Sequence, residues 1–160
     1  MSIFIIPITL ISMKNELNPH LGLSQKDFDR IVKLVPFVAC EVLIYDKKKG
    51  ILLLKRRDRY YKGWHIPGGL LRFRESFDER IQAVARDELG IHISSHKLIN
   101  TYNYIDDPRG HTVGFVFLCR ATGIAKNGKY FKTIPKNTLS HQKPYLKKVF
   151  ALLLKKNSKK

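Results

Sequence analysis

The chain has 160 residues, of which 44% are hydrophobic and 27% are charged, and its formal net charge is +17. That length supports one well-buried core and excludes two full domains, so we expect a single domain. Its core should run over residues 21–155, between an apolar tail at residues 1–20 and a basic tail at residues 156–160. Two widely separated cysteines, Cys40 and Cys119, exclude a disulfide framework and indicate reduced core residues of a cytoplasmic protein.

The first residues, MSIFIIPITLISMK, are apolar. They lack a basic start and a small-residue cleavage site, and they are too short to span a bilayer. We therefore expect neither a signal peptide nor a membrane span. The preferred interpretation is an extra tail before a second candidate start at Met13. A peripheral strand or a membrane-touching segment is the alternative.

The positive charge is concentrated in the last third of the chain, where no acidic residue follows Asp107. A field of this kind attracts phosphates and other polyanions over about a Debye length. The alternative is a lysine-rich, solvated helix near the C-terminus. Nucleic-acid binding is disfavoured, because the basic run lacks the interleaved aromatic residues of a stacking platform.

The first half of the chain predicts one helix and a hairpin. Ser24 followed by Asp27 is typical of a helix start, and Pro36 should end that helix. Residues 37–45 form an apolar run that predicts a buried strand. After a lysine-rich turn, residues 51–54 return as the second arm of a hairpin.

The second half predicts two further strands and two helices. Residues 55–59 should form a basic loop, and residues 76–89 a helix with one apolar face. Strands are expected at residues 98–105 and 113–121, and a last helix at residues 143–155. Strands and helices do not alternate regularly, which favours a mixed sheet covered by helices.

Between these elements lies a spaced pattern of glycines and carboxylates. A diphosphate ester is hydrolysed when divalent metal neutralises its oxygens, and adjacent carboxylates at a helix end can hold Mg²⁺ or Mn²⁺. Asp87 and Glu88 are such a pair. Glu88 falls on the apolar helix face, where an unpaired carboxylate is unfavourable and a metal would remove the conflict. The alternative is ordinary surface ion pairing with Arg80, Arg86 or the loop arginines.

The pattern is similar to the signature of the Nudix hydrolases, G-x5-E-x7-R-E-U-x-E-E-x-G-U with U apolar. The matching residues are Gly69, Glu75, Asp87 (Asp for Glu), Glu88, Gly90 and Ile91. The resemblance implies an α/β (α+β) fold, a Nudix-type α/β/α sandwich with a mixed β-sheet, and a small-molecule nucleotide substrate. It also implies that the carbonyl of Gly68 joins Asp87 and Glu88 as a metal ligand. Gly69 would permit close backbone approach, and Glu75 would hold the loop.

Two positions depart from that signature. Val84 stands where the family has a metal-binding glutamate, so one metal bridged to substrate phosphates is expected rather than a cluster. Ala83 stands where the family has an arginine that pairs with the loop glutamate. A neighbouring arginine must then serve Glu75, the candidates being Arg72, Arg74 and Arg80.

Over residues 24–121 the order of motifs also resembles one branch of the family, the GDP-mannose mannosyl hydrolases. In that branch water attacks the sugar carbon and the diphosphate leaves. The resemblance implies that Arg56 faces the diphosphate, that Glu41 lies near the nucleotide, and that Glu88 holds Mg²⁺. The branch takes its general base from a late-loop histidine, but residues 122–140 contain no histidine here.

His111 and His141 are the remaining downstream candidates for a base, because a neutral imidazole is suited to that task. His111 is preferred, since it follows a glycine at a strand entrance. His65 fits a structural role equally well. Arg57, beside Arg56, is a second candidate for phosphate contact. Each of these residues could instead be a solvated or packing side chain.

Three functions stay open from the sequence. The preferred one is a metal-dependent hydrolase of a nucleoside diphosphate linked to another moiety, with a nucleotide sugar such as GDP-mannose favoured. The second is a pyrophosphohydrolase of nucleoside triphosphates or ADP-ribose. The third is a binding module without catalysis, which Val84 favours and the Asp87–Glu88 pair opposes. Relatives are often homodimers, although no self-complementary face is evident in this sequence.

Overall fold

The computed structural model describes residues 23–157 of the chain. The expectations for residues 1–20, including the second start at Met13, lie outside this range, as does the end of the basic tail. Among the described residues, no helix is long and apolar enough to cross a membrane.

A mixed sheet of seven strands forms the middle of the fold. The strands are β1 (Phe37–Asp46), β2 (Gly50–Arg57), β3 (Lys62–His65), β4 (Gly68–Leu70), β5 (His92–Asp107), β6 (Gly110–Thr122) and β7 (Lys129–Phe131). Their order is β3-β2-β1-β6-β5, with β4 paired to β1 and β7 paired to β2. The β1–β6 pair is parallel, whereas the other strand pairs of the sheet are antiparallel.

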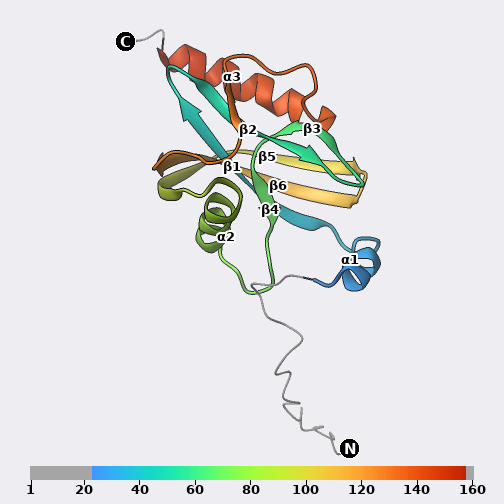
Figure 1. Cartoon of the computed structure of the whole chain (residues 1–160). Coiled ribbons are helices and arrows are strands. Elements are labelled where there is room, and N and C mark those ends of the chain that lie inside the picture. Colours follow the sequence, from blue (N-terminus) through green and yellow to red (C-terminus); the bar gives the residue numbers. More distant parts are fainter. Residues whose placement is uncertain (1–22, 158–160) are drawn as a thin grey trace, which may run out of the picture.

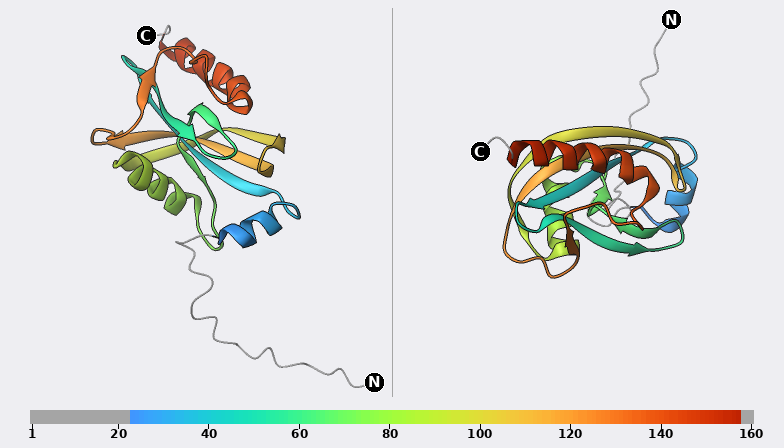
Figure 2. Two further views of the ribbon diagram at one scale, coloured as in Figure 1. Left: turned by 45° about the vertical axis from the view of Figure 1, so that its right-hand side comes forward. Right: turned by 90° about the horizontal axis from the view of Figure 1, so that it is seen from above.

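Helices cover both faces of the sheet. They are α1 (Gln25–Ile31), α2 (Phe77–Val84), the π-helical turn η1 (Ala85–Leu89), the 3-10 turn η2 (Ser140–Gln142) and α3 (Lys143–Asn157). In Figures 1 and 2, α2 and α3 lie on opposite sides of the sheet. This arrangement confirms the expected mixed sheet between helices.

Each face has its own apolar core. One core packs Ile81, Val84 and Leu89 against strand residues such as Val42 and Phe117. The other packs residues of α3 against the opposite face of the sheet, and they are Tyr145, Leu146, Val149, Phe150 and Leu153. Alternate residues of β1 therefore serve the two cores, which is why this strand reads as one continuous apolar run.

The predicted helix over residues 76–89 is confirmed, but its last turn is π-helical. Ser76 caps the start by accepting a hydrogen bond from the Glu79 backbone, and the Glu79 side chain bonds back to Ser76. Gly90 ends the helix in the left-handed conformation. The π turn inserts one residue into the helical repeat over residues 85–89, the segment that carries Asp87 and Glu88.

Three predicted boundaries were wrong. The first helix ends at Ile31, before Pro36. A basic loop was expected over residues 55–59, but its first three residues, Lys55, Arg56 and Arg57, pair with β3 and form the end of β2. Strands β5 and β6 are longer than predicted, and their alternation is interrupted by bulges, such as the one between Ile93 and Ser95.

A buried carboxylate joins the sheet to the C-terminal elements. Glu41 on β1 accepts hydrogen bonds from the Tyr102 hydroxyl at 2.7 Å and the Tyr145 hydroxyl at 2.8 Å. Gln142 Nε2 lies 3.0 Å from both carboxylate oxygens of Glu41. The other end of the same amide, Gln142 Oε1, accepts a hydrogen bond from the Ile66 N–H at 2.8 Å. Burial raises the pKa of Glu41 to about 7, while bonds from Tyr102, Tyr145 and Gln142 act to lower it.

Tyr145→Phe removes one of these donors, so we expect it to lower the free energy of unfolding by about 1–2 kcal/mol. Because the pKa of Glu41 is raised from 4.5 to about 7, this residue lowers the free energy of unfolding progressively as pH rises from about 4.5 to about 7. Without the Tyr145 hydroxyl that pKa rises further, so the deficit should be larger near pH 8 than near pH 6.

Urea unfolding at both pH values measures the deficit. Tyr130→Phe is the control, because it removes the same hydroxyl from a half-buried ring and, in the described structure, that hydroxyl has no hydrogen bond. A deficit that is equal for the two variants, or independent of pH, would contradict the role of Tyr145.

Candidate active site

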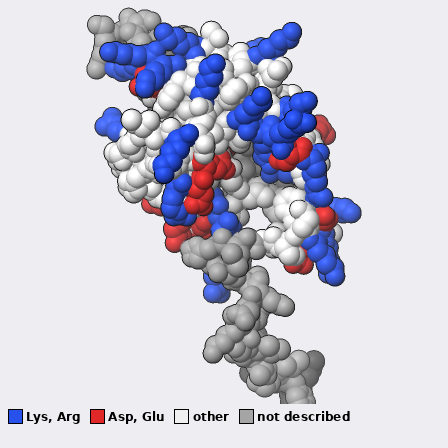
Figure 3. Space-filling model, in the orientation of Figure 1, with Lys and Arg blue, Asp and Glu red and all other residues white. Residues whose placement is uncertain are grey.

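A hollow of about 780 Å³ opens between β2, β3, β4 and the end of η1. It is lined by Leu54, Lys55, Arg56, Arg57, Asp58, Trp64, His65, Gly68, Gly69, Asp87, Glu88, Arg109, Asn127 and Gly128. Figure 3 shows basic side chains spread over one face of the molecule, with acidic groups between them. Four cationic residues and three carboxylates thus meet in one hollow, although they come from distant parts of the chain.

Glu88 is the unusual residue of this hollow. Its Oε2 atom is buried and, among the described residues, has no hydrogen-bond partner. Burial raises its pKa to about 7, while a hydrogen bond from the backbone of Gly68 and the charge of Arg56 act to lower it. A buried oxygen without a partner is unfavourable by about 1–3 kcal/mol, so this atom is suited to an added ligand.

The donor set fits one divalent ion. A carboxylate oxygen is a hard ligand of the type that Mg²⁺ and Mn²⁺ prefer, and Glu88 offers one that nothing else uses. Asp87 also lines the hollow, but its side chain is 59% exposed and its Oδ1 lies 2.8 Å from Arg86 Nε. Within residues 23–157, no group of three or more His, Cys, Asp or Glu side chains is arranged to hold a metal. The residues therefore fit a single ion and not a carboxylate cluster.

The glycine turn lies against β1. Gly68 pairs with Glu41, and Gly69 pairs with Cys40. A Cβ atom on Gly68 would lie 2.9 Å from the Cys40 carbonyl oxygen, whereas the nearest atom to a Cβ on Gly69 would be 3.4 Å away. Against β1 the closest backbone approach is therefore at Gly68, and a close approach at Gly69 stays a prediction.

Gly68→Ala should accordingly move β4 and disturb the hollow, while Gly69→Ala should be tolerated. We expect Gly68→Ala to lower the free energy of unfolding by about 1–3 kcal/mol, as for overpacking elsewhere, and Gly69→Ala by less than about 1 kcal/mol. Chemical denaturation of the two variants and the unmodified chain measures this. Equal losses of stability in both variants would show that a clash with the Cys40 carbonyl does not cause the loss in Gly68→Ala.

Glu75 finds its partner on α2. Arg80 Nη2 lies 2.6 Å from Glu75 Oε1, and Arg80 Nε donates to Glu75 Oε2 at 2.8 Å. The backbone N–H of Arg72 donates to the same Oε2 at 2.8 Å. Both side chains of the ion pair are buried. Arg80 precedes Ala83 by three residues, so it reaches Glu75 from the same helix face.

Arg56 and Arg57 both line the hollow. Arg56 Nε lies 2.5 Å from Asp58 Oδ2, and its Cζ lies 4.6 Å from the centroid of the Tyr61 ring. Arg109 lines the same hollow but was not among the sequence candidates. The signal that could have indicated it is the turn DDPRG, which places an arginine two residues after a carboxylate at a strand end.

Glu41 does not line the large hollow. It lines a smaller cavity of about 30 Å³ behind the glycine turn, where Tyr102, Tyr145 and Gln142 occupy its oxygens. Its carboxylate is therefore fully hydrogen-bonded within the protein. The expectation that it lies near a bound nucleotide stays a prediction.

The structure separates the histidine candidates. His111 hydrogen-bonds to Asn103 Oδ1 and is not among the residues that line either cavity. His65 lines both cavities, and His141 lines the smaller one. Burial lowers the pKa of each of these two to about 4, so both imidazoles are neutral at pH 7.

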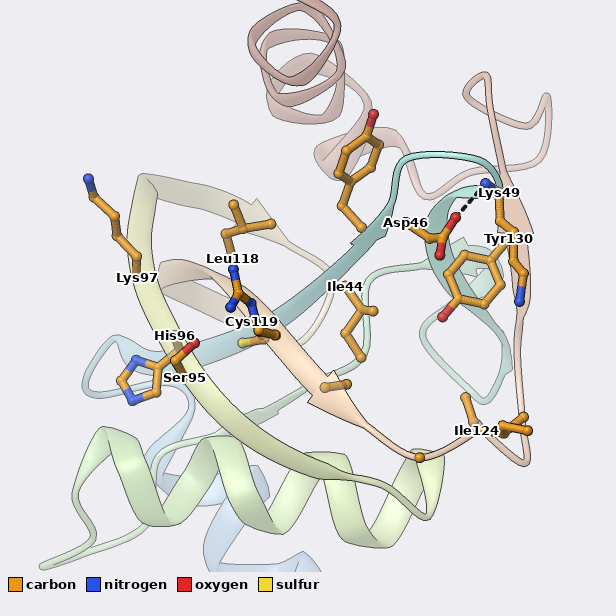
Figure 4. A pocket seen from close by; sticks show the side chains of 15 residues that line it. Ile44, Asp46, Lys49, Ser95, His96, Lys97, Leu118, Cys119, Ile124 and Tyr130 are labelled. Carbon is orange, nitrogen blue, oxygen red and sulfur yellow. Dashed lines mark hydrogen bonds between the residues drawn. The ribbon is translucent and has the colours of Figure 1, made fainter. Parts of the chain in front are cut away.

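A second hollow of about 550 Å³ lies where β1 and β6 diverge (Figure 4). Lys49 and Lys97 lie on opposite sides of it, so their charges do not converge. Its carboxylate is Asp46, whose Oδ1 accepts from the backbone N–H groups of Lys48 and Lys49 at 2.8 Å. This hollow offers no carboxylate pair to a metal, which leaves the first hollow as the candidate active site.

Binding of one divalent ion by Glu88 is testable without substrate. We expect millimolar Mg²⁺ to raise the melting temperature of the protein by about 2–5 °C, because it binds only the folded state. Glu88→Gln should remove that gain. Asp106→Asn, an exposed carboxylate away from the hollow, should keep it. Equal Mg²⁺ responses in both variants, measured by differential scanning calorimetry, would exclude Glu88 as a ligand.

Comparison with known proteins identifies relatives of this fold and sequence. A model of the NUDIX domain matches residues 36–139. An ADP-ribose pyrophosphatase of Methanocaldococcus jannaschii is 31% identical over 121 residues, which cover 69% of this chain and 71% of that protein. The low-salt glycan biosynthesis protein Agl8 of Haloferax volcanii is 27% identical over 90 residues, covering 56% of this chain and 57% of that protein.

Solved structures agree in fold. The MutT NUDIX hydrolase from Burkholderia pseudomallei superposes with a TM-score of 0.62 at 23% identity, covering 71% of this chain and 97% of that one. The MutT protein from Methanosarcina mazei superposes with a TM-score of 0.59 at 18% identity, covering 78% of this chain and 97% of that one. At these identities the likeness shows a shared fold.

Proposed function

The chain belongs to the Nudix family, and we propose that it is a metal-dependent hydrolase of a nucleoside diphosphate linked to another moiety. The family supports a hydrolase with a small-molecule nucleotide substrate. The observation that carries the proposal is the buried, unpartnered Oε2 of Glu88 in a hollow lined by arginines. We propose Mg²⁺ or Mn²⁺ as the ion and residues 21–155 as one Nudix domain.

In this proposal Glu88 and Asp87 hold the ion, with the carbonyl of Gly68 as a third ligand. When bound, the ion would neutralise phosphate oxygens and thereby favour attack by water. Arg56 and Arg57 face the same hollow and would neutralise the remaining anionic oxygens. Glu75, held by Arg80, keeps the loop between the glycine turn and α2 in place.

A neutral imidazole near the hollow could accept the proton of the attacking water. His65 lines the same hollow as Glu88, and its lowered pKa leaves it unprotonated at pH 7. We propose His65, rather than His111, as the histidine to test first, because His111 does not line the hollow.

For the substrate, we propose the ADP-ribose type ahead of a nucleotide sugar such as GDP-mannose. The relative that is 31% identical is an ADP-ribose pyrophosphatase. The Agl8 relative is a glycan biosynthesis protein, but the match covers only 57% of it. Attack at phosphorus is the reaction that the first relative's name implies for that protein, and GDP-mannose hydrolysis remains the second candidate.

A binding module without catalysis is the alternative from another class. Val84 supports it, because the side chain is buried in the core where the family signature has a glutamate. The buried Glu88 oxygen opposes it, because a module that needs no metal gains nothing from an unpartnered carboxylate. We therefore place the hydrolase first.

A product assay tests these alternatives. Purified protein with Mg²⁺ or Mn²⁺ is incubated with ADP-ribose, nucleoside triphosphates and nucleotide sugars, and the products are identified by mass spectrometry. We expect AMP and ribose 5-phosphate from ADP-ribose. We expect Glu88→Gln to lower kcat at least about 100-fold, as for loss of one transition-state interaction.

Other outcomes select other functions. A nucleoside diphosphate plus free sugar would place the attack at the sugar carbon and move the proposal to the mannosyl hydrolase type. Turnover of no substrate, combined with metal-dependent thermal stabilisation by one of them, would establish the binding module and refute the hydrolase.

A further inference from the structure

Two arginines from distant elements meet at one tyrosine ring. Arg56 comes from the end of β2, and Arg109 from the turn between β5 and β6. Their Cζ atoms lie 4.6 Å and 5.1 Å from the centroid of the buried Tyr61 ring. Both arginines line the large hollow with Glu88, and both line the small cavity behind it. The sheet thus brings two like charges together at the mouth of the candidate active site.

Each arginine is anchored by its own carboxylate. Arg56 Nε bonds to Asp58 Oδ2, while Arg109 Nη2 lies 3.3 Å from Asp107 Oδ2. Asp107 is itself held: its oxygens accept from the Tyr61 hydroxyl, from Thr112 Oγ1 at 2.8 Å, and from the Arg109 backbone at 2.9 Å. Its side chain is 1% exposed, so this anchor is fixed inside the protein.

The anchors leave part of each guanidinium free. In the described structure, no protein acceptor is found for either Nη atom of Arg56 or for Nη1 of Arg109. The side chain of Arg109 is only 17% exposed and lines the hollow, and its unused Nη1 is open to solvent, so an added ligand can reach it. Partly buried donors without acceptors are a site for an anion.

We propose that Arg56 and Arg109 together bind the diphosphate of the substrate, and that Asp107 is a positioning residue that acts through Arg109. The proposal rests on the proposed function and extends it to a residue that was not among the sequence candidates and lies outside the family signature. The ligand class is a diphosphate whose anionic oxygens lie between the two arginines and an ion on Glu88. The anchored, ring-packed guanidinium groups are ordered before the ligand arrives, which lowers the entropy cost of binding.

Binding of inorganic pyrophosphate tests this without turnover. Isothermal titration calorimetry with pyrophosphate and Mg²⁺ is done on the unmodified chain, Arg109→Gln and Arg120→Gln. Arg120 is the matched control, because it lies on β6 and lines only the second hollow. We expect Arg109→Gln to weaken binding at least about tenfold, as for loss of a charge-assisted hydrogen bond, and Arg120→Gln to change it less than about twofold.

If Arg109→Gln and Arg120→Gln weaken pyrophosphate binding equally, the loss of affinity comes from net charge alone and the proposal is overturned. Absence of pyrophosphate binding to the unmodified chain would also overturn it. Arg109→Lys keeps the charge but not the planar donors, and we expect it to restore little of the affinity. If Arg109→Gln fails to fold, Arg109→Lys takes its place in the comparison with Arg120→Gln. A protein that binds pyrophosphate through Arg109 but turns over no substrate would refute the hydrolase and leave this site in place.

The role of Asp107 is measured with a double-mutant cycle. Asp107→Asn alone should weaken pyrophosphate binding, because Arg109 loses its anchor. If Asp107 acts through Arg109, then the double variant Asp107→Asn, Arg109→Gln should bind no more weakly than Arg109→Gln alone. Additive losses would show that Asp107 affects the site by another route and would remove it from the proposal.

Discussion

The buried carboxylate of Glu41 is the interaction on which the arrangement of this fold depends. It lies in the middle of the central strand, and its donors come from β5, η2 and α3. A charged or polar group at such a place is tolerated only if the surrounding donors satisfy it, so these elements must close around it together. Through Gln142 the same network reaches Ile66, directly before the glycine turn. The glycine turn of the candidate active site is therefore positioned by a hydrogen-bond network whose residues Glu41 and Gln142 do not line the large hollow.

Glu41 and Glu88 are both removed from water, with opposite outcomes. Glu41 is surrounded by donors, whereas Glu88 keeps one oxygen without a partner. Burial raises the pKa of each to about 7, and the two residues differ in the supply of hydrogen bonds to their oxygens. A satisfied carboxylate fixes structure, and an unsatisfied one in an open hollow remains available to a ligand.

How far the sequence predicted the fold and the site depended on whether the signal was local. The apolar run of β1 and the capped helix that carries Asp87 and Glu88 were predicted, because their patterns lie within one element. The short strands KGWH, GGL and KYF are too brief for any periodicity to be seen. Arg109 meets Arg56 only through the packing of the sheet, and the choice of Arg80 over Arg72 or Arg74 depends on the direction of a side chain.

The parallel pairing of β1 with β6 has a consequence for how the protein is made. These two strands are separated by β2 to β5 in the chain, so the central sheet contact closes a long loop and slows folding. During synthesis, β1 leaves the ribosome well before β6 and before Gln142 and Tyr145, the residues that satisfy Glu41. β1 can pair early with β2 and β4, but its contact with β6 and the hydrogen bonds from Gln142 and Tyr145 to Glu41 form only when nearly all of the described chain has emerged. The nascent protein depends on late closure, and the interval before it is the stage at which chaperones would be most needed.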